Sequence, residues 1–135
     1  MKKWIPSFIK ERKAAHLLYM DKTCSKALPI LYTYKDGHLV FPLSIINPTF
    51  ISHLRESSEY TISIIGESQR LNLYGKLTIG TSIVSSGNHE YSEIFKPYLN
   101  IIPHLSKILW CNFNPDRIQA YERNDLVDEI VLEIL

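Results

Sequence analysis

Alternation of apolar and polar residues with a period of two is the main pattern along this chain. It is longest over residues 70–79. The inward positions of this run are Leu71, Leu73, Leu77 and Ile79. A period of two is typical of a strand with one buried face. Gly75 interrupts the inward face, which predicts a bulge or the close approach of another group.

Four shorter stretches are also β-prone, namely residues 15–20, 28–34, 38–43 and 59–65. The polar stretches 21–26 and 66–69 predict turns next to two of them. Asp36-Gly37 joins the second stretch to the third, and an Asp-Gly pair at such a place predicts a hairpin with a type I′ turn. Pro42 has no N–H for a ladder, so we expect it at an edge or a strand end.

The second half of the chain is less regular. Polar residues over 81–88 predict a loop. Residues 108–113 and 117–121 predict a final strand, or a hairpin around Asn114-Pro115-Asp116. Residues 126–135 fit either a short helix or an edge strand.

Helical patterns are few and short. The first helix is expected over about residues 6 to 14, with Pro6 in its first turn. Asn47 followed by Pro48 predicts the start of a second helix, with Asn as N-cap and Pro at the first helical position. We expect it to end near residues 55–58. A further helix is expected over about 89–96.

This order of elements predicts one domain over residues 1–135 that is mainly β (α+β), a small antiparallel β-barrel with a few short helices. The barrel is expected over about residues 15–122. A C-terminal tail is expected over 123–135.

The charge and composition exclude several classes of protein. Fifteen Lys and Arg against fourteen Asp and Glu give a net charge of +1, without the basic excess typical of nucleic-acid binders. The basic residues near the start favour a solvated helix face, with a polyanion contact as the alternative. No stretch approaches the roughly 20 apolar residues that span a bilayer, and no apolar segment follows the basic start. We therefore expect a cytoplasmic protein that binds neither membrane nor nucleic acid.

Motifs for side-chain catalysis are missing from the sequence. The histidines lack metal-ligand spacing, the carboxylates do not pair, and no nucleophile elbow or phosphate-binding loop is present. No metal site is expected, and no catalytic residue can be assigned. Cys24 and Cys111 are expected to be free thiols, buried or half-buried, rather than a disulfide.

A set of small motifs resembles the pyridoxamine 5'-phosphate oxidase-like split barrels, which bind FMN. The matching segments are Ala27-Leu28-Pro29, Asp36 to Phe41, Ser44, His53-Leu54-Arg55, Thr61 to Ile64, Arg70 to Leu77 and Asn114 to Ile118. They span roughly residues 10 to 122. The resemblance implies a split barrel that forms a homodimer, with FMN in a groove between the subunits.

The resemblance also implies which residues hold the FMN phosphate. By position these are Ser44, Thr49 and Ser52, beside the helix start that Asn47 and Pro48 provide. A helix N-terminus favours an anion, because its free N–H groups and its dipole point at it. One departure is Phe50, which stands where many family members have Lys.

Positive charge for the phosphate would then have to come from Arg55, Arg70 or Lys76. The implied activity is that of an FMN-dependent oxidoreductase acting on a small molecule that the sequence does not identify, since a flavin supplies the redox chemistry itself.

Two alternatives stay open. Some split barrels bind or degrade haem, for which His53 or His104 would be the axial ligand. The Phe50 departure favours the other alternative, a split barrel without a cofactor that serves as a binding or structural dimer.

Overall fold

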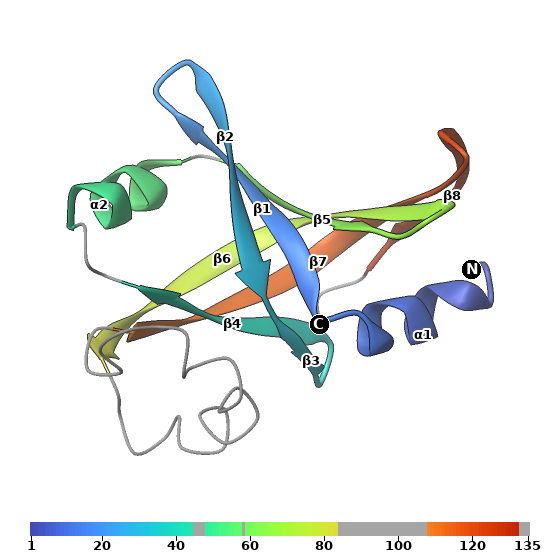
Figure 1. The fold of residues 1–135 in the computed structure, drawn as a ribbon, viewed down its shortest axis with the longest axis horizontal. Coiled ribbons are helices and arrows are strands. Elements are labelled where there is room, and N and C mark those ends of the chain that lie inside the picture. Colours follow the sequence, from blue (N-terminus) through green and yellow to red (C-terminus); the bar gives the residue numbers. More distant parts are fainter. Residues whose placement is uncertain (45–47, 58, 84–107, 133–135) are drawn as a thin grey trace.

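The computed structural model describes residues 1–44, 48–57, 59–83 and 108–132. In these residues eight antiparallel strands form one sheet that curls into a half-barrel, and two short helices accompany it (Figure 1). The elements in chain order are α1 (Trp4–Glu11), β1 (Ala14–Asp21), β2 (Cys24–Leu31), β3 (Thr33–Lys35), β4 (His38–Ser44), α2 (Pro48–Glu56), β5 (Tyr60–Ile65), β6 (Gln69–Ile83), β7 (Ile108–Glu122) and β8 (Asp125–Val131). The predicted fold class, a small antiparallel split β-barrel, is confirmed.

The sheet is built around its two longest strands, β6 and β7, which pair with each other. The strand order is β2-β1-β5-β6-β7-β4-β3, and β8 pairs with β7 beside it. Neither helix of the described residues has the length and apolarity that crossing a membrane would require.

The core lies on the concave face of this sheet. The alternating positions Leu71 and Leu73 of β6 are fully buried, as are Leu39 and Phe41 of β4. Each such side chain contributes about 2 kcal/mol through the removal of apolar surface from water. Helix α1 adds Ile5, Phe8 and Ile9 to the same core.

Helix α1 is shorter at its C-terminal end than the sequence predicts. It ends at Glu11, because the backbone of Arg12 is already extended (ψ 146°). The carbonyl of Lys13 accepts a hydrogen bond from the Tyr32 N–H at 2.8 Å, and the Tyr32 hydroxyl donates to the Ile9 carbonyl at 2.8 Å. Tyr32 therefore fixes both the end of the helix and the start of the sheet.

The hairpins confirm one prediction and correct another. Asp36 and Gly37 have φ of 52° and 84°, as a type I′ turn requires. The turn predicted over 21–26 is wrong in length: β1 pairs with β2 up to Asp21 and Cys24, which leaves Lys22 and Thr23 as the turn. Lys22 takes a positive φ of 60° to close it. A two-residue turn matches the twist of the strands better than a longer loop does.

Pro42 lies at a point of β4 where its missing N–H removes no hydrogen bond to β3. Strand β3 pairs with β4 only from His38 to Val40. Beyond that point β4 has β7 as its ladder partner on one side, with Pro42 opposite Trp110. The expected position at an edge is confirmed.

The bulge predicted at Gly75 is present. Tyr74 pairs with Arg117 and Gly75 pairs with Pro115, so Asp116 is the extra residue on β7. A Cβ on Gly75 would overlap the carbonyl oxygen of Asn114 and lie 2.8 Å from the Pro115 Cα. The backbones of β6 and β7 approach too closely here for any side chain.

Three further expectations for the second half of the chain have clear outcomes. The loop predicted from residue 81 is wrong at its start, because β6 continues to Ile83. Residues 108–122 form one continuous strand, not a hairpin, because the bulge absorbs Pro115 without reversing the chain. Much of the expected tail is the edge strand β8, which pairs with β7. The helix predicted over 89–96 lies outside the described residues.

A substitution at the bulge tests how much the fold depends on this close approach. We expect Gly75→Ala to lower the free energy of unfolding by at least about 2 kcal/mol, because a new methyl group must push two strands apart. Gly37→Ala is the control, since nothing lies within 4 Å of its Cβ position. It should cost only about 1 kcal/mol, from the positive φ. Urea unfolding followed by circular dichroism measures both, and equal losses would contradict the role of the bulge.

Candidate functional site

The segment that links β4 to α2 carries most of the predicted site. Ser44 is the last residue of β4, and Thr49 is the second residue of α2. Ser52 lies on α2 with an exposed side chain. Asn47 lies outside the described residues. Ser44 and Thr49 thus stand at a strand end and near a helix start, five residues apart in the sequence.

Helix α2 is held firmly at its other end. Leu54 is fully buried, and its carbonyl accepts a hydrogen bond from the Tyr60 hydroxyl at 2.6 Å. Ser57 receives a hydrogen bond from the Met20 N–H at 3.0 Å and donates to the Glu59 carbonyl at 2.7 Å. Burial raises the pKa of Tyr60, with the nearby Cys111 as a smaller cause, so its hydroxyl stays a donor. These contacts fix the direction of the helix.

The charges on α2 favour an anion only weakly. Its first turn contains no acidic residue, so nothing there repels a phosphate. Its basic residues, His53 and Arg55, lie in the last turn and have partners of their own. The His53 Nδ1 is 3.5 Å from the Asp21 carboxylate, and an Arg55 Nη is 3.5 Å from the Gly80 carbonyl.

The remaining predicted ligands, Arg70 and Lys76, are not on this segment. Lys76 is an exposed residue of β6 next to the bulge. Arg70 lies near the start of β6, where its guanidinium carbon is 4.4 Å from the centre of the Tyr121 ring. Gly80, which Arg55 contacts, is about 33 Å further along the strand at the usual rise per residue. Within one chain, Arg70 is therefore far from α2.

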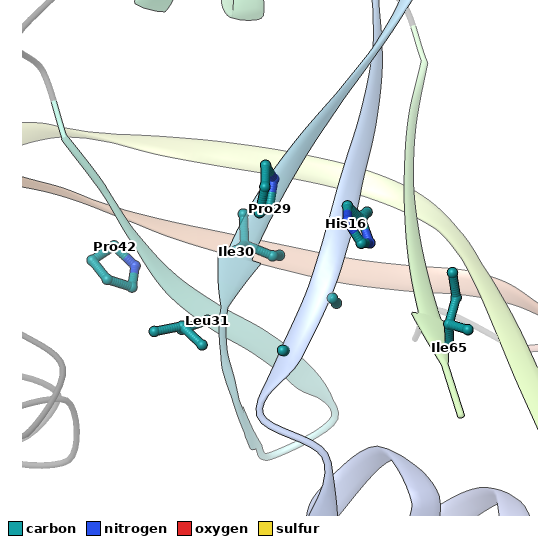
Figure 2. Close-up of a pocket in the computed structure, with 8 residues that line it drawn as sticks. His16, Pro29, Ile30, Leu31, Pro42 and Ile65 are labelled. Atoms are coloured by element: carbon teal, nitrogen blue, oxygen red, sulfur yellow. The ribbon is translucent and has the colours of Figure 1, made fainter. Parts of the chain in front are cut away.

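An apolar hollow of about 380 Å³ lies across β1, β2, β4 and the end of β5 (Figure 2). Its lining is Ala14, Ala15, His16, Pro29, Ile30, Leu31, Pro42 and Ile65. Ile65 is 57% exposed, which is unusual for so large an apolar side chain on a strand. His16 is the one titratable side chain in the lining of the hollow. The hollow therefore suits the packing of apolar groups more than proton transfer.

Sequence reasoning missed this hollow, although a signal was present. In β1 and β2 the core takes Ala15 and Ile30, so the opposite face should carry polar residues. Instead, Ala14, Pro29 and Leu31 occupy that face. Two apolar faces on one strand indicate a second buried surface.

The thiols and the metal-binding residues complete the inventory. In the part of the chain that the structure describes, no three His, Cys, Asp or Glu side chains gather where they could hold a metal ion. Both cysteines are free: Cys111 is buried as predicted, whereas Cys24 is exposed, so the prediction was wrong for Cys24. Cys24 begins β2 directly after a two-residue turn, where no other element covers it. Burial raises the pKa of the Cys111 thiol to about 12.

Known structures share this fold although their sequences differ. No protein-family model matches the sequence, and no curated protein matches it by sequence. A Clostridium acetobutylicum protein of the pyridoxinephosphate oxidase family, related to general stress protein 26, superposes with a TM-score of 0.74 at 9% identity, over 94% of this chain and 91% of its own. A FAD-binding protein from Mesorhizobium loti gives 0.70 at 11% identity, over 90% and 94%.

A haem-binding protein from Mycobacterium smegmatis gives a TM-score of 0.66 at 13% identity, over 93% of this chain and 58% of its own. At such identities the likeness establishes the fold. The chain has the split-barrel fold of the pyridoxamine 5'-phosphate oxidase-like proteins, as the resemblance of its motifs predicted.

The two thiols should differ sharply in reactivity, because only the thiolate attacks a disulfide reagent. We expect Cys24 alone to react in the native protein at about pH 8. Cys111 should react only after unfolding, since its pKa is raised to about 12 and no solvent reaches it. Thiol titration of the wild type and of Cys24→Ser measures this, and a fast phase that persists in Cys24→Ser would contradict it.

Proposed function

We propose that this protein binds FMN as a homodimer and acts as a flavin-dependent oxidoreductase on a small molecule. The observation that supports this best is the junction of β4 and α2, in a fold shared with flavin-binding proteins. There, hydroxyl residues stand at a strand end and at a helix start that no acidic residue opposes. A helix start of this kind is a ready anion site.

The residues on this segment fit a phosphate held by neutral donors. Ser44, Thr49 and Ser52 would contribute hydroxyl groups, and the first turn of α2 would contribute backbone N–H groups. Charge-assisted partners are stronger than neutral ones, and the basic residues of the helix, His53 and Arg55, contact other groups. We therefore expect the flavin to be held less tightly than a lysine on this helix would allow.

The redox chemistry would belong to the flavin, which exchanges a hydride or single electrons through its ring system. The role of the chain is then to bind the cofactor, orient it and keep water from one side of it. This is consistent with the absence of an acid–base pair or a nucleophile motif from the sequence. The substrate would lie against the flavin ring.

The homodimer is proposed on the evidence of the apolar hollow in Figure 2. An exposed Ile65 on one side of the hollow, with Leu31 and Pro42 on the other, is the kind of surface that a second copy of the chain covers. A stable interface buries about 800 Å² on each partner. The hollow would form the centre of such a surface.

Haem is the second candidate cofactor, because the fold is shared with a protein named for haem binding. His53 would be the ligand within the described residues, since its side chain is 38% exposed and accessible. Its Nδ1 faces Asp21, an arrangement that leaves Nε2 for a metal. A cofactor-free binding dimer is the third candidate, favoured by the weak positive charge at α2.

The phosphate assignment is tested by titrating the purified protein with FMN and following the visible absorbance of the flavin. We expect saturable binding that weakens by about tenfold or more in the double variant Ser44→Ala/Thr49→Ala, because hydrogen bonds to a charged group contribute about 1.5–3 kcal/mol. The matched control is Ser7→Ala/Thr33→Ala, which removes two hydroxyls from α1 and β3 and should leave the affinity unchanged.

The same titration discriminates among the three candidates. Unchanged FMN affinity in the double variant would show that the phosphate lies elsewhere. If haemin gives a Soret band that His53→Ala abolishes, the cofactor is haem and not flavin. If the protein binds neither cofactor, the proposal of a flavin enzyme is wrong and the cofactor-free dimer remains.

The dimer surface is tested by adding a charge to it. We expect wild-type protein to sediment as a dimer and Ile65→Lys to shift it toward monomer, because a lysine in the centre of an apolar interface loses its hydration. Val131→Lys is the control, since Val131 is 74% exposed on β8 and outside the hollow. A monomeric wild type, or equal dissociation in both variants, would contradict this interface.

A further inference from the structure

Two hairpin turns lie side by side at the end of the sheet away from α2 (Figure 1). One joins β5 to β6 through Gly66 and Ser68, and the other joins β7 to β8 through Arg123 and Asn124. The Arg123 N–H donates to the Ser68 carbonyl at 2.9 Å, which ties the turns together. A hollow of about 440 Å³ opens between them.

The guanidinium group of Arg70 is positioned to bind a ligand in this hollow. It lines the hollow together with Tyr121, and its guanidinium group stacks on the Tyr121 ring at 4.4 Å. The Tyr121 hydroxyl donates to the Gln119 amide oxygen at 3.1 Å, which holds the ring in place. The Arg70 Nε is buried and has no hydrogen-bond partner. A buried donor without a partner is costly, unless a ligand satisfies it.

A second arginine of the same strand pair shows what is missing at Arg70. Arg117 stacks on Tyr74 at 4.4 Å, in the same cross-strand arrangement. Arg117 also has an acidic partner, Glu129, at 3.8 Å. Within the described residues, no acidic side chain forms an ion pair with Arg70. Arg117 therefore has both an aromatic ring and an anionic partner, whereas Arg70 has the aromatic ring alone.

The surroundings of Arg70 add positive charge. Arg123 lines the same hollow with an exposed side chain. Arg12, after the end of α1, does not line the hollow: its guanidinium carbon is 4.8 Å from the centre of the Phe8 ring, and an Nη is 3.0 Å from the Cβ position of Gly66. Like Arg70, neither has an acidic partner among the residues that the structure describes.

The acidic side chains near the hollow do not cancel this charge. Glu67 lines the hollow, but its side chain is exposed on the turn, and the exposed Asp125 lies near Arg123 outside the lining of the hollow. Glu122 already accepts a hydrogen bond from the Trp4 indole N–H at 2.8 Å, which turns its carboxylate toward α1. Among the residues that line the hollow, two guanidinium groups, those of Arg70 and Arg123, therefore stand against the one carboxylate of Glu67.

We infer that this hollow is a binding site for an oxyanion, and that its ligand is the phosphate group of a small molecule. A guanidinium edge presents parallel N–H donors that match two oxygens of a phosphate, and stacking on an aromatic ring holds the edge in place. Arg70 would bind the anion through its guanidinium N–H groups, while Arg123 would supply charge from the neighbouring turn. The site is separate from the one proposed for FMN and does not depend on flavin binding.

Titration of the flavin-free full-length protein with inorganic phosphate tests this site. The readout is the ¹H–¹⁵N resonance of the Arg70 Nε–H, with acetate and chloride at matched ionic strength as comparison anions. We expect a saturable shift with phosphate, and an affinity about tenfold weaker in Arg70→Gln and in Arg123→Gln when it is followed on the backbone amides of the turn, since each removes a charged donor.

Arg117→Gln is the matched control. It removes the same charge and the same kind of stack from the same strand pair, and it should leave phosphate affinity within about twofold because the hollow is unchanged. Thermal unfolding of each variant shows that it is folded, and Arg123→Gln lies on an exposed turn where folding is least at risk. Loss of phosphate binding in all three variants alike would reveal a general charge effect and overturn the site.

Two further outcomes decide the proposal. Absence of a saturable shift at the Arg70 Nε–H, or equal shifts with chloride, would show that no oxyanion site exists. The double variant Ser44→Ala/Thr49→Ala separates this site from the flavin site, because it should retain full phosphate binding at Arg70 even if FMN affinity is lost. A protein that fails to bind FMN but binds phosphate here would contradict the proposed function alone.

Discussion

The pairing of β6 with β7 is the constraint on which the rest of the structure depends. Each strand has 15 residues, far longer than the usual five or six. Strand β5 adds to one side of this pair, and β4 and β8 add to the other. A ladder about 50 Å long must bend if one face is to enclose a core. The bulge at Gly75 supplies that bend, because an extra residue on one strand increases the local twist.

The bend also divides the molecule into two functional ends. On one side of the bulge, β6 runs toward Gly80 and the contact with α2. On the other side it runs back to Arg70 and the paired turns. Leu71 and Leu73 belong to the closed core, whereas Leu77 and Ile79 beyond the bulge are only partly buried. The core is therefore closed on the Arg70 side of the bulge and less completely covered on the Gly80 side.

The sequence predicted those features that depend on local chemistry. The Asp36-Gly37 turn, the helix start at Pro48 and the Gly75 bulge each follow from the backbone preferences of one or two residues. The features it did not predict depend on what lies across the sheet. Nothing in the local pattern of residues 108–122 shows that Pro115 can sit in a continuous strand. It can do so because Gly75 opposite has no side chain.

The same limit applies to the candidate sites. Ser44, Thr49, Ser52 and His53 fall on one segment of 10 residues, and their proximity could be predicted from position alone. Arg70 was grouped with them as a source of charge, although β6 carries it to the far end of the sheet. Its neighbours Tyr121 and Arg123 are more than 50 residues away in sequence, and only strand register brings them together. The apolar hollow likewise combines residues from four strands.

Charge is distributed unevenly between these two ends, and this bears on both proposals. The sequence at the junction of β4 and α2 contains hydroxyl residues, while the basic residues of the helix, His53 and Arg55, contact Asp21 and Gly80. The hollow at the paired turns is lined by two arginines, Arg70 and Arg123, which have no acidic partner in the described part of the chain. About 33 Å of strand separates Arg70 from Gly80, so neither end of a single chain can lend its groups to the other. An anion at α2 would therefore be held by neutral donors, whereas an anion at Arg70 would be held by charge.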